Sequence, residues 1–83
     1  MERYEVNLNT RSFTQKHKGK IHRLKITAKD HHKAINSAIH LKYGKLADII
    51  TYETYKAYGH VINLFEYEVD GNKYFGTYDV EVN

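Results

Sequence analysis

Two early stretches of the chain alternate between apolar and polar side chains, which is the period of a strand with one buried face. In the first stretch Tyr4, Val6 and Leu8 alternate with polar neighbours. In the second, Leu24 and Ile26 alternate with basic residues. The pattern therefore predicts two strands whose apolar faces belong to one core.

A helix is predicted next, over residues 31–43. Asp30 stands where an N-cap residue is needed, and Gly44 supplies the left-handed residue that commonly ends a helix. The apolar residues between them follow the spacing of one buried stripe, namely Ala34, Ile35, Ala38, Ile39 and Leu41.

The C-terminal half is predicted to be a meander of three strands. The dipeptide Asp70-Gly71 is a strong hairpin signal, because a type I′ turn needs positive φ at both central residues. If the pairing that this turn starts continues along both strands, Val61 lies opposite Val80.

A second turn is predicted at Gly59-His60, and this placement sets Glu53 opposite Glu66. Like charges directly opposite each other are unfavourable in a sheet unless a partner relieves them. The alternative, a second helix over residues 46–58, is disfavoured because that stretch is rich in β-branched and aromatic residues.

Together these elements predict one α+β domain spanning residues 1–83, of order β-β-α-β-β-β, with an antiparallel sheet and a single helix packed on one face. Strand alternation leaves an apolar group with an acidic rim on the outer face, which is typical of a protein interface. That candidate interface is Tyr55, Ala57, Ile62, Leu64 and Phe75. Alternatively, the helix packs on this outer face, and the opposite face of the sheet, which is rich in tyrosine, is the exposed one.

Charge is distributed unevenly along the chain. Residues 11–45 contain ten Lys or Arg against the single acid Asp30, whereas residues 46–83 contain two Lys against seven acids. The formal net charge of +3 therefore conceals a basic and an acidic half. The electrostatic field of such an uneven charge distribution influences which partners bind, and how fast, more than it influences the fold.

The basic half contains a candidate site for nucleic acid. The segment 10–20 is longer than a hairpin connection needs, and we expect it to be a flexible basic loop. Its cations, with one aromatic ring, can contact phosphates with little base preference. The alternative is a solvated loop that only keeps the protein in solution. The candidate residues are Arg11, Phe13, Lys16, His17, Lys18, Lys20, Arg23 and Lys25.

Several function classes receive no support from the sequence. There is no cysteine, and the histidines do not stand at recognised metal-ligand spacings, so we expect no metal and no cofactor. No catalytic motif is present, and we expect no enzyme and no catalytic residues. No apolar run approaches the length of a membrane span, and the composition is typical of a cytoplasmic protein.

The sequence therefore indicates a small non-enzymatic binding module. The first hypothesis is contact with a polyanion, most simply nucleic acid. The alternative is an adaptor or inhibitor, of the kind that phages encode, which binds a host protein through the outer sheet face. In either case we expect a monomer or weak dimer, because symmetric pairing of the outer faces brings acidic residues against their own copies.

The first hypothesis predicts that binding to random DNA or RNA depends strongly on salt. If the cations of the candidate site neutralise four to six phosphates, the logarithm of the binding constant falls with the logarithm of salt concentration at a slope of roughly −3 to −5. A titration at several salt concentrations measures this slope. A slope near zero, or unchanged binding after charge removal at Lys16, Lys18 and Lys20, contradicts the hypothesis.

Overall fold

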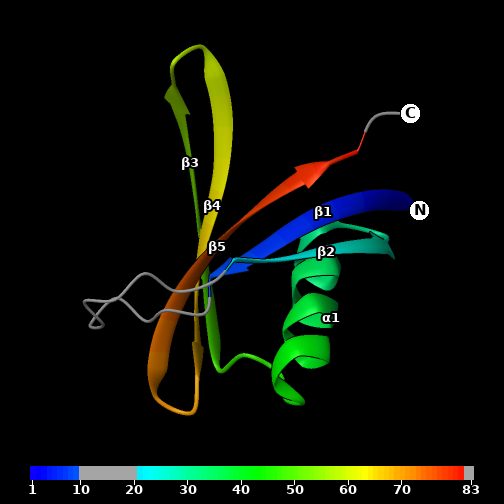
Figure 1. Cartoon of the computed structure of the whole chain (residues 1–83), viewed down its shortest axis with the longest axis vertical. Coiled ribbons are helices and arrows are strands. Elements are labelled where there is room, and N and C mark those ends of the chain that lie inside the picture. The colour runs from blue at the N-terminus through cyan, green and yellow to red at the C-terminus, as the bar shows by residue number, and fades with distance from the viewer. Residues whose placement is uncertain (10–20, 82–83) are drawn as a thin grey trace.

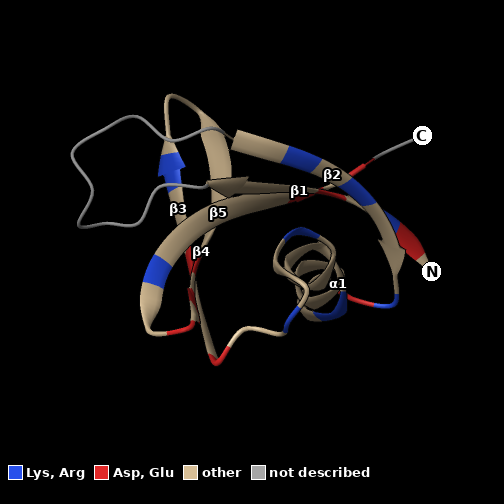
Figure 2. Ribbon diagram, turned by 60° about the horizontal axis from the view of Figure 1, so that its bottom comes forward, with Lys and Arg blue, Asp and Glu red and all other residues tan. Residues whose placement is uncertain are grey.

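The computed structural model describes residues 1–9 and 21–81, which form one antiparallel sheet and one helix. In sheet order the strands run β2-β1-β5-β4-β3, and the helix covers one face of the sheet (Figures 1 and 2). This confirms the predicted α+β class and the order β-β-α-β-β-β. The elements are β1 (Glu2–Asn9), β2 (Ile21–Ala28), α1 (His31–Tyr43), β3 (Ile49–Ala57), β4 (His60–Val69) and β5 (Asn72–Val80).

Helix α1 begins and ends where its caps were predicted. The carboxylate of Asp30 accepts a hydrogen bond from the backbone N–H of Lys33 at 2.9 Å, and this bond lowers the pKa of Asp30. Gly44 has φ 73° and its N–H donates to the carbonyl of His40. Leu41 was predicted to be buried, but it is 68% exposed in the last turn of the helix. The buried helix residues are Ala34, Ile35, Ala38 and Ile39.

The core lies between α1 and the inner face of the sheet, the face that the helix covers. Val6 and Leu8 of β1 are fully buried, and Phe65 and Tyr67 of β4 are 1% exposed. The helix packs on β1 and β2 and reaches the end of β5, whereas its contact with β3 is made by the rings of His31 and His32, which meet Tyr52. The helix therefore covers the inner face only at the end of the sheet that contains β1 and β2.

Strand β5 is shared between two groups of strands. The Asp70-Gly71 turn has φ values of 54° and 79°, as a type I′ turn requires, and β5 pairs with β4 from Val69–Asn72 to Leu64–Thr77. Beyond that point β5 leaves β4 and pairs with β1 instead. The predicted pairing of Val61 with Val80 is therefore wrong.

Past this divergence β3 and β4 continue as a two-stranded ribbon, which we call the arm (residues 54–63; Figure 1). The arm ends in a turn at Tyr58-Gly59, with φ values of 52° and 77°, and not one residue later as predicted. In both hairpins glycine occupies the second position of the turn.

The change of turn shifts the β3–β4 register by two residues, so Glu53 lies opposite Leu64 and not opposite Glu66. The expected like-charge pair is not formed. A shift of two residues keeps each side chain on its predicted face, because the period of a strand is also two.

Gly76 lies where β1, β4 and β5 come together, opposite both Leu8 and Phe65. A Cβ atom at this position would be 2.3 Å from the carbonyl oxygen of Asn7 and 2.6 Å from the Phe65 ring. No side chain fits there without displacement of the β1 backbone.

We therefore expect Gly76→Ala to destabilise the fold by about 3 kcal/mol, the upper end of the cost of overpacking, because the obstacle includes a backbone atom. The matched change Gly59→Ala at the tip of the arm meets no atom within 4 Å and carries only the strain of positive φ, about 1 kcal/mol. Urea unfolding of the two variants compares these free energies. Equal unfolding midpoints would show that β1 and β5 do not approach so closely.

Candidate binding surfaces

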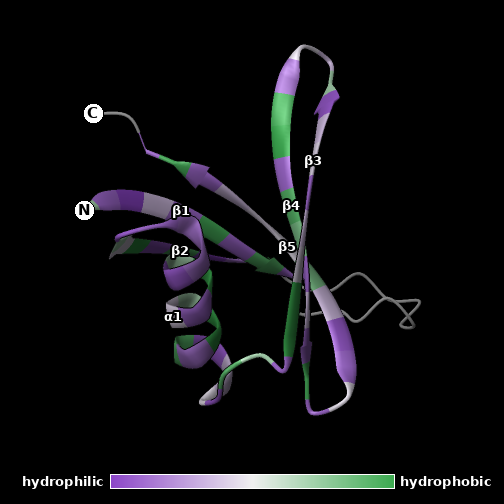
Figure 3. Ribbon diagram, turned by 180° about the vertical axis from the view of Figure 1, so that it is seen from behind, coloured by the Kyte–Doolittle hydropathy of each residue, from purple (hydrophilic) through white to green (hydrophobic). Residues whose placement is uncertain are grey.

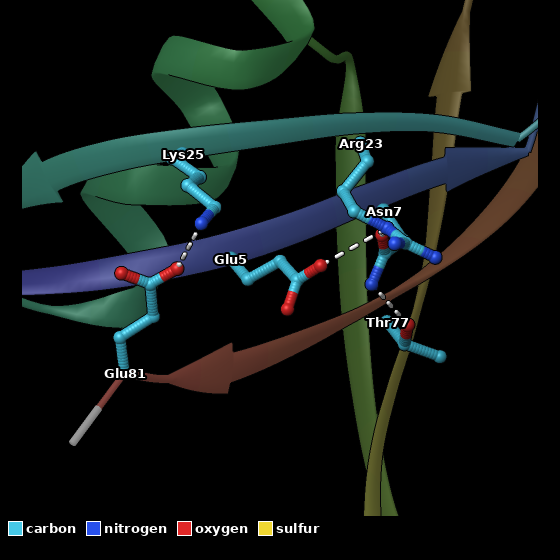
Figure 4. Close-up of polar contacts among 6 residues, drawn as sticks. All are labelled: Glu5, Asn7, Arg23, Lys25, Thr77 and Glu81. Carbon is cyan, nitrogen blue, oxygen red and sulfur yellow. Dashed lines mark hydrogen bonds and ion pairs between the residues drawn. The ribbon is translucent and has the colours of Figure 1, made fainter.

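Two of the predicted polyanion-binding residues, Arg23 and Lys25, lie on the outer face of the sheet, where both form ion pairs (Figure 4). Arg23 Nε is 3.0 Å from Glu5 Oε1 and donates to Asn7 Oδ1 at 3.2 Å. Lys25 Nζ is 3.1 Å from Glu81 Oε1. Each cation of β2 thus has a carboxylate from a neighbouring segment beside it.

This part of the outer face therefore carries mixed charge. Asp79 lies near Glu5, and burial together with that neighbouring carboxylate raises the pKa of Asp79. Glu81 also forms an ion pair with Arg3, whose Nε lies 3.4 Å from Glu81 Oε2. Exposed ion pairs of this kind contribute little to stability, but they neutralise the charge that a phosphate backbone would meet. The other predicted polyanion-binding residues, Arg11, Phe13, Lys16, His17, Lys18 and Lys20, lie outside the described residues.

The second candidate surface, which we call the outer patch, consists of Tyr55, Ala57, Ile62, Leu64 and Phe75. The register places all of its members on the face opposite α1, so the alternative in which the helix covers this side is excluded. Tyr55 is 43% exposed and the other members are half-buried. Tyr55 lies opposite Ile62.

A shallow hollow lies beside the outer patch. It is lined by the patch residues Leu64 and Phe75 together with Thr51, Glu53 and Glu66. Its walls thus combine apolar side chains with two carboxylates. The structure brings together an apolar floor and an acidic rim, as an interface with a basic partner requires.

The inner face of the sheet is also open along the arm. Tyr58 is fully exposed at the tip and Val61 is 54% exposed, and Tyr52, just outside the arm, is 39% exposed. Tyr58 and Val61 are exposed because α1 lies over β1 and β2 and does not extend over the arm. Figure 3 shows hydrophobic residues along the part of β4 that forms the arm.

The start of α1 is joined to β3 by an aromatic cluster that the sequence did not indicate. The ring of His31 stacks on Tyr78 with centroids 4.8 Å apart and meets the edge of Tyr52 at 5.1 Å. His32 Nδ1 is 2.5 Å from the Tyr52 hydroxyl. Burial raises the pKa of Tyr52 to about 12, with smaller contributions from Tyr78 and Asp30. No local sequence pattern indicates this cluster, because it depends on the long-range placement of α1, β3 and β5.

The described part of the chain was compared with the requirements of a metal site and of a membrane-spanning helix, and it meets neither. Within it, no group of three or more His, Asp or Glu side chains is arranged to hold a metal ion. Helix α1 is neither long nor apolar enough to cross a membrane, and residues 1–9 and 21–81 contain no other helix.

Comparison with known proteins does not assign the chain to a family. No family model matches it, and no curated protein and no solved structure is similar to it. The function therefore has to be argued from the surfaces of the protein alone.

The aromatic cluster predicts a late tyrosine ionisation. The phenol of Tyr52 should ionise near pH 12 instead of pH 10, because burial disfavours the phenolate. Its contribution to stability is then fully present below pH 10 and is lost as the pH rises toward 12. An absorbance titration of tyrosinate, run beside unfolding at each pH, checks both statements.

The variant Tyr52→Phe should remove one late-ionising group and reduce the alkaline loss of stability. The control is Tyr58→Phe, whose side chain is fully exposed and which should leave the late step in place. An identical late step in wild type and Tyr52→Phe would show that Tyr52 is not held against the helix.

Proposed function

We propose that this protein is a non-enzymatic binding module that recognises another protein through the arm and the outer patch. The observation that carries the proposal is the arm itself, which projects past the point where β5 turns away (Figure 1). Its apolar side chains lie on both faces of a ribbon that is only two strands wide.

Such a ribbon gains little stability of its own in water, where an isolated hairpin is marginal at best. Tyr55 and Ala57 point to one face of the arm and Val61 to the other, and Tyr58 stands at its tip. Aromatic and aliphatic side chains in this setting are the residues that interfaces bury. Contact with a partner would remove their apolar surface from water and add a second layer to the ribbon.

The charges around the outer patch favour a basic partner surface. Glu53, Glu66 and Glu68 share the outer face with the patch, and Lys73 is the cation opposite Glu68. Complementary charge mainly raises the association rate and selects among partners, whereas the buried apolar contacts hold the complex together. An adaptor or inhibitor that acts on a host protein in the cytoplasm would use the charges to select its partner and the apolar contacts to hold it.

Polyanion binding is the weaker proposal for the described surfaces. Arg23 and Lys25 would have to exchange their carboxylates for phosphates, and Glu5, Asp79 and Glu81 would remain nearby. The exchange forfeits existing pairs, so the gain from counterion release is smaller than for free cations. That proposal consequently depends on residues 10–20.

The proposal predicts that Leu64→Lys abolishes capture of a protein partner. A cell extract is treated with nuclease, and tagged protein is used to recover partners at high salt. Leu41→Lys is the matched control, since it makes the same change on the exposed side of α1. We expect Leu41→Lys to recover the partner as well as the wild type does, and both variants to melt within a few degrees of wild type, because neither residue belongs to the buried core.

A second variant, Tyr55→Ser, keeps the test decisive if Leu64→Lys is unstable, because Tyr55 is exposed on the arm. Loss of capture by Tyr55→Ser supports the proposal. Capture that survives in Tyr55→Ser and in a folded Leu64→Lys contradicts it. If the wild-type protein recovers partners from untreated extract but not from nuclease-treated extract, the result favours the polyanion instead.

A further inference from the structure

Strand β3 is one edge of the sheet and leaves one row of its backbone groups without a neighbouring strand. In the described part of the chain it pairs with β4 alone, over all nine residues from Ile49 to Ala57. Unpaired edge groups are a template for another extended chain.

The two edges of the sheet differ in how they are protected. At the β2 edge, Arg23 and Lys25 project on the outer face and α1 packs against Leu24 and Ile26 on the inner face. Charged residues and a covering helix are the usual protection against edge pairing. Strand β3 contains no proline, and its one lysine is Lys56 near the tip. The helix meets β3 at Tyr52, through His31 and His32, and does not lie over the rest of the strand. It is therefore the edge that can accept a further strand.

We infer that β3 is a docking edge for an extended segment of another protein, in which basic residues alternate with apolar ones. The inference rests on the proposed function and states how the partner binds. Main-chain hydrogen bonds to β3 would supply affinity, and alternate side chains would supply specificity, as in other cases of strand addition.

The basic character of the partner follows from the positions of the acids. Glu53 belongs to β3 itself, and Glu66 lies directly behind the small Thr51 in the next strand. Adjacent strands are about 4.8 Å apart, so a Lys or Arg beside Thr51 can extend over that side chain toward Glu66. The hollow lined by Thr51, Glu53, Leu64 and Glu66 accommodates the alkyl part of such a side chain.

A second copy of this chain fits the edge less well. Symmetric antiparallel pairing of β3 with its own copy about the middle of the strand brings Glu53 close to its equivalent, which is unfavourable. The β2 edge of another copy is basic, but its Arg23 and Lys25 are already paired with Glu5 and Glu81. A separate basic partner meets neither difficulty.

The test uses a synthetic peptide as long as β3 that alternates Lys with Val and is N-methylated along one edge to prevent its self-association. A Glu–Val peptide of the same design is the comparison. We expect the Lys–Val peptide to shift the β3 amide resonances of the whole protein and to slow their hydrogen exchange, while β2 amides stay unchanged. The Glu–Val peptide should bind more weakly.

Charge reversal then tests the role of the acid. Glu53→Lys should weaken binding of the Lys–Val peptide by about fivefold or more and strengthen binding of the Glu–Val peptide. Lys25→Glu, on the opposite edge, should change neither affinity. Equal affinity of wild type and Glu53→Lys for the Lys–Val peptide overturns the inference of a basic partner.

The remaining outcomes separate this inference from the proposed function. Perturbation of β2 in place of β3, or no binding of the Lys–Val peptide, overturns strand addition. If Tyr55→Ser still abolishes partner capture in that case, the proposed function stands without it. Light scattering that shows a wild-type dimer, with β3 amides protected at its interface, identifies a second copy as the occupant and likewise overturns the inference.

Discussion

The structure depends on the way in which β5 is divided between two neighbours. Its first half pairs with β4 and its second half with β1, and the two pairings overlap only around Gly76 and Thr77. The overlap requires the backbone of β1 and the ring of Phe65 to come within contact distance of residue 76, which only glycine permits. The position of the core and the existence of the arm both follow from this crossing.

Because the strands diverge there, one helix of thirteen residues cannot cover the whole sheet. It lies over β1 and β2, where Val6 and Leu8 are fully buried, and in the described part of the chain β3 has β4 as its one neighbouring strand. A small domain with a limited core thus retains a long hairpin that adds little to its own stability. The contacts of Tyr52 with His31 and His32 connect β3 to the helix.

Local signals predicted much of this fold, and non-local contacts account for what was missed. Asp30, Gly44 and Asp70-Gly71 each act within a few residues, so their caps and turn could be predicted from sequence. The turn at Tyr58-Gly59 was misplaced by one residue, since a tyrosine at positive φ is uncommon. The end of the β4–β5 pairing could not be predicted, because it is set by competition from β1.

The candidate surfaces divide in the same way. Alternation alone grouped the outer patch correctly on one face of the sheet, because a two-residue error in register does not change the face, but it left open which face the helix covers. The surroundings of Arg23 and Lys25 could not be predicted in this way, since Glu5 and Glu81 come from segments that the sequence separates widely. Clustering of charge along the chain is therefore a weak guide to surface charge in an antiparallel sheet, where each strand lies between segments from elsewhere in the sequence.

The arm connects the fold to the proposed function through its energetics. Apolar surface left exposed on a two-stranded ribbon contributes nothing to folding, but it is available to stabilise a complex. The same crossing at Gly76 that withdraws β5 from the arm also keeps the core compact beneath α1, so the arm can change its contacts without loss of the core. A partner strand that pairs with β3 would give the arm a third strand on the side away from β5, which makes binding an extension of the sheet and not a rearrangement of it.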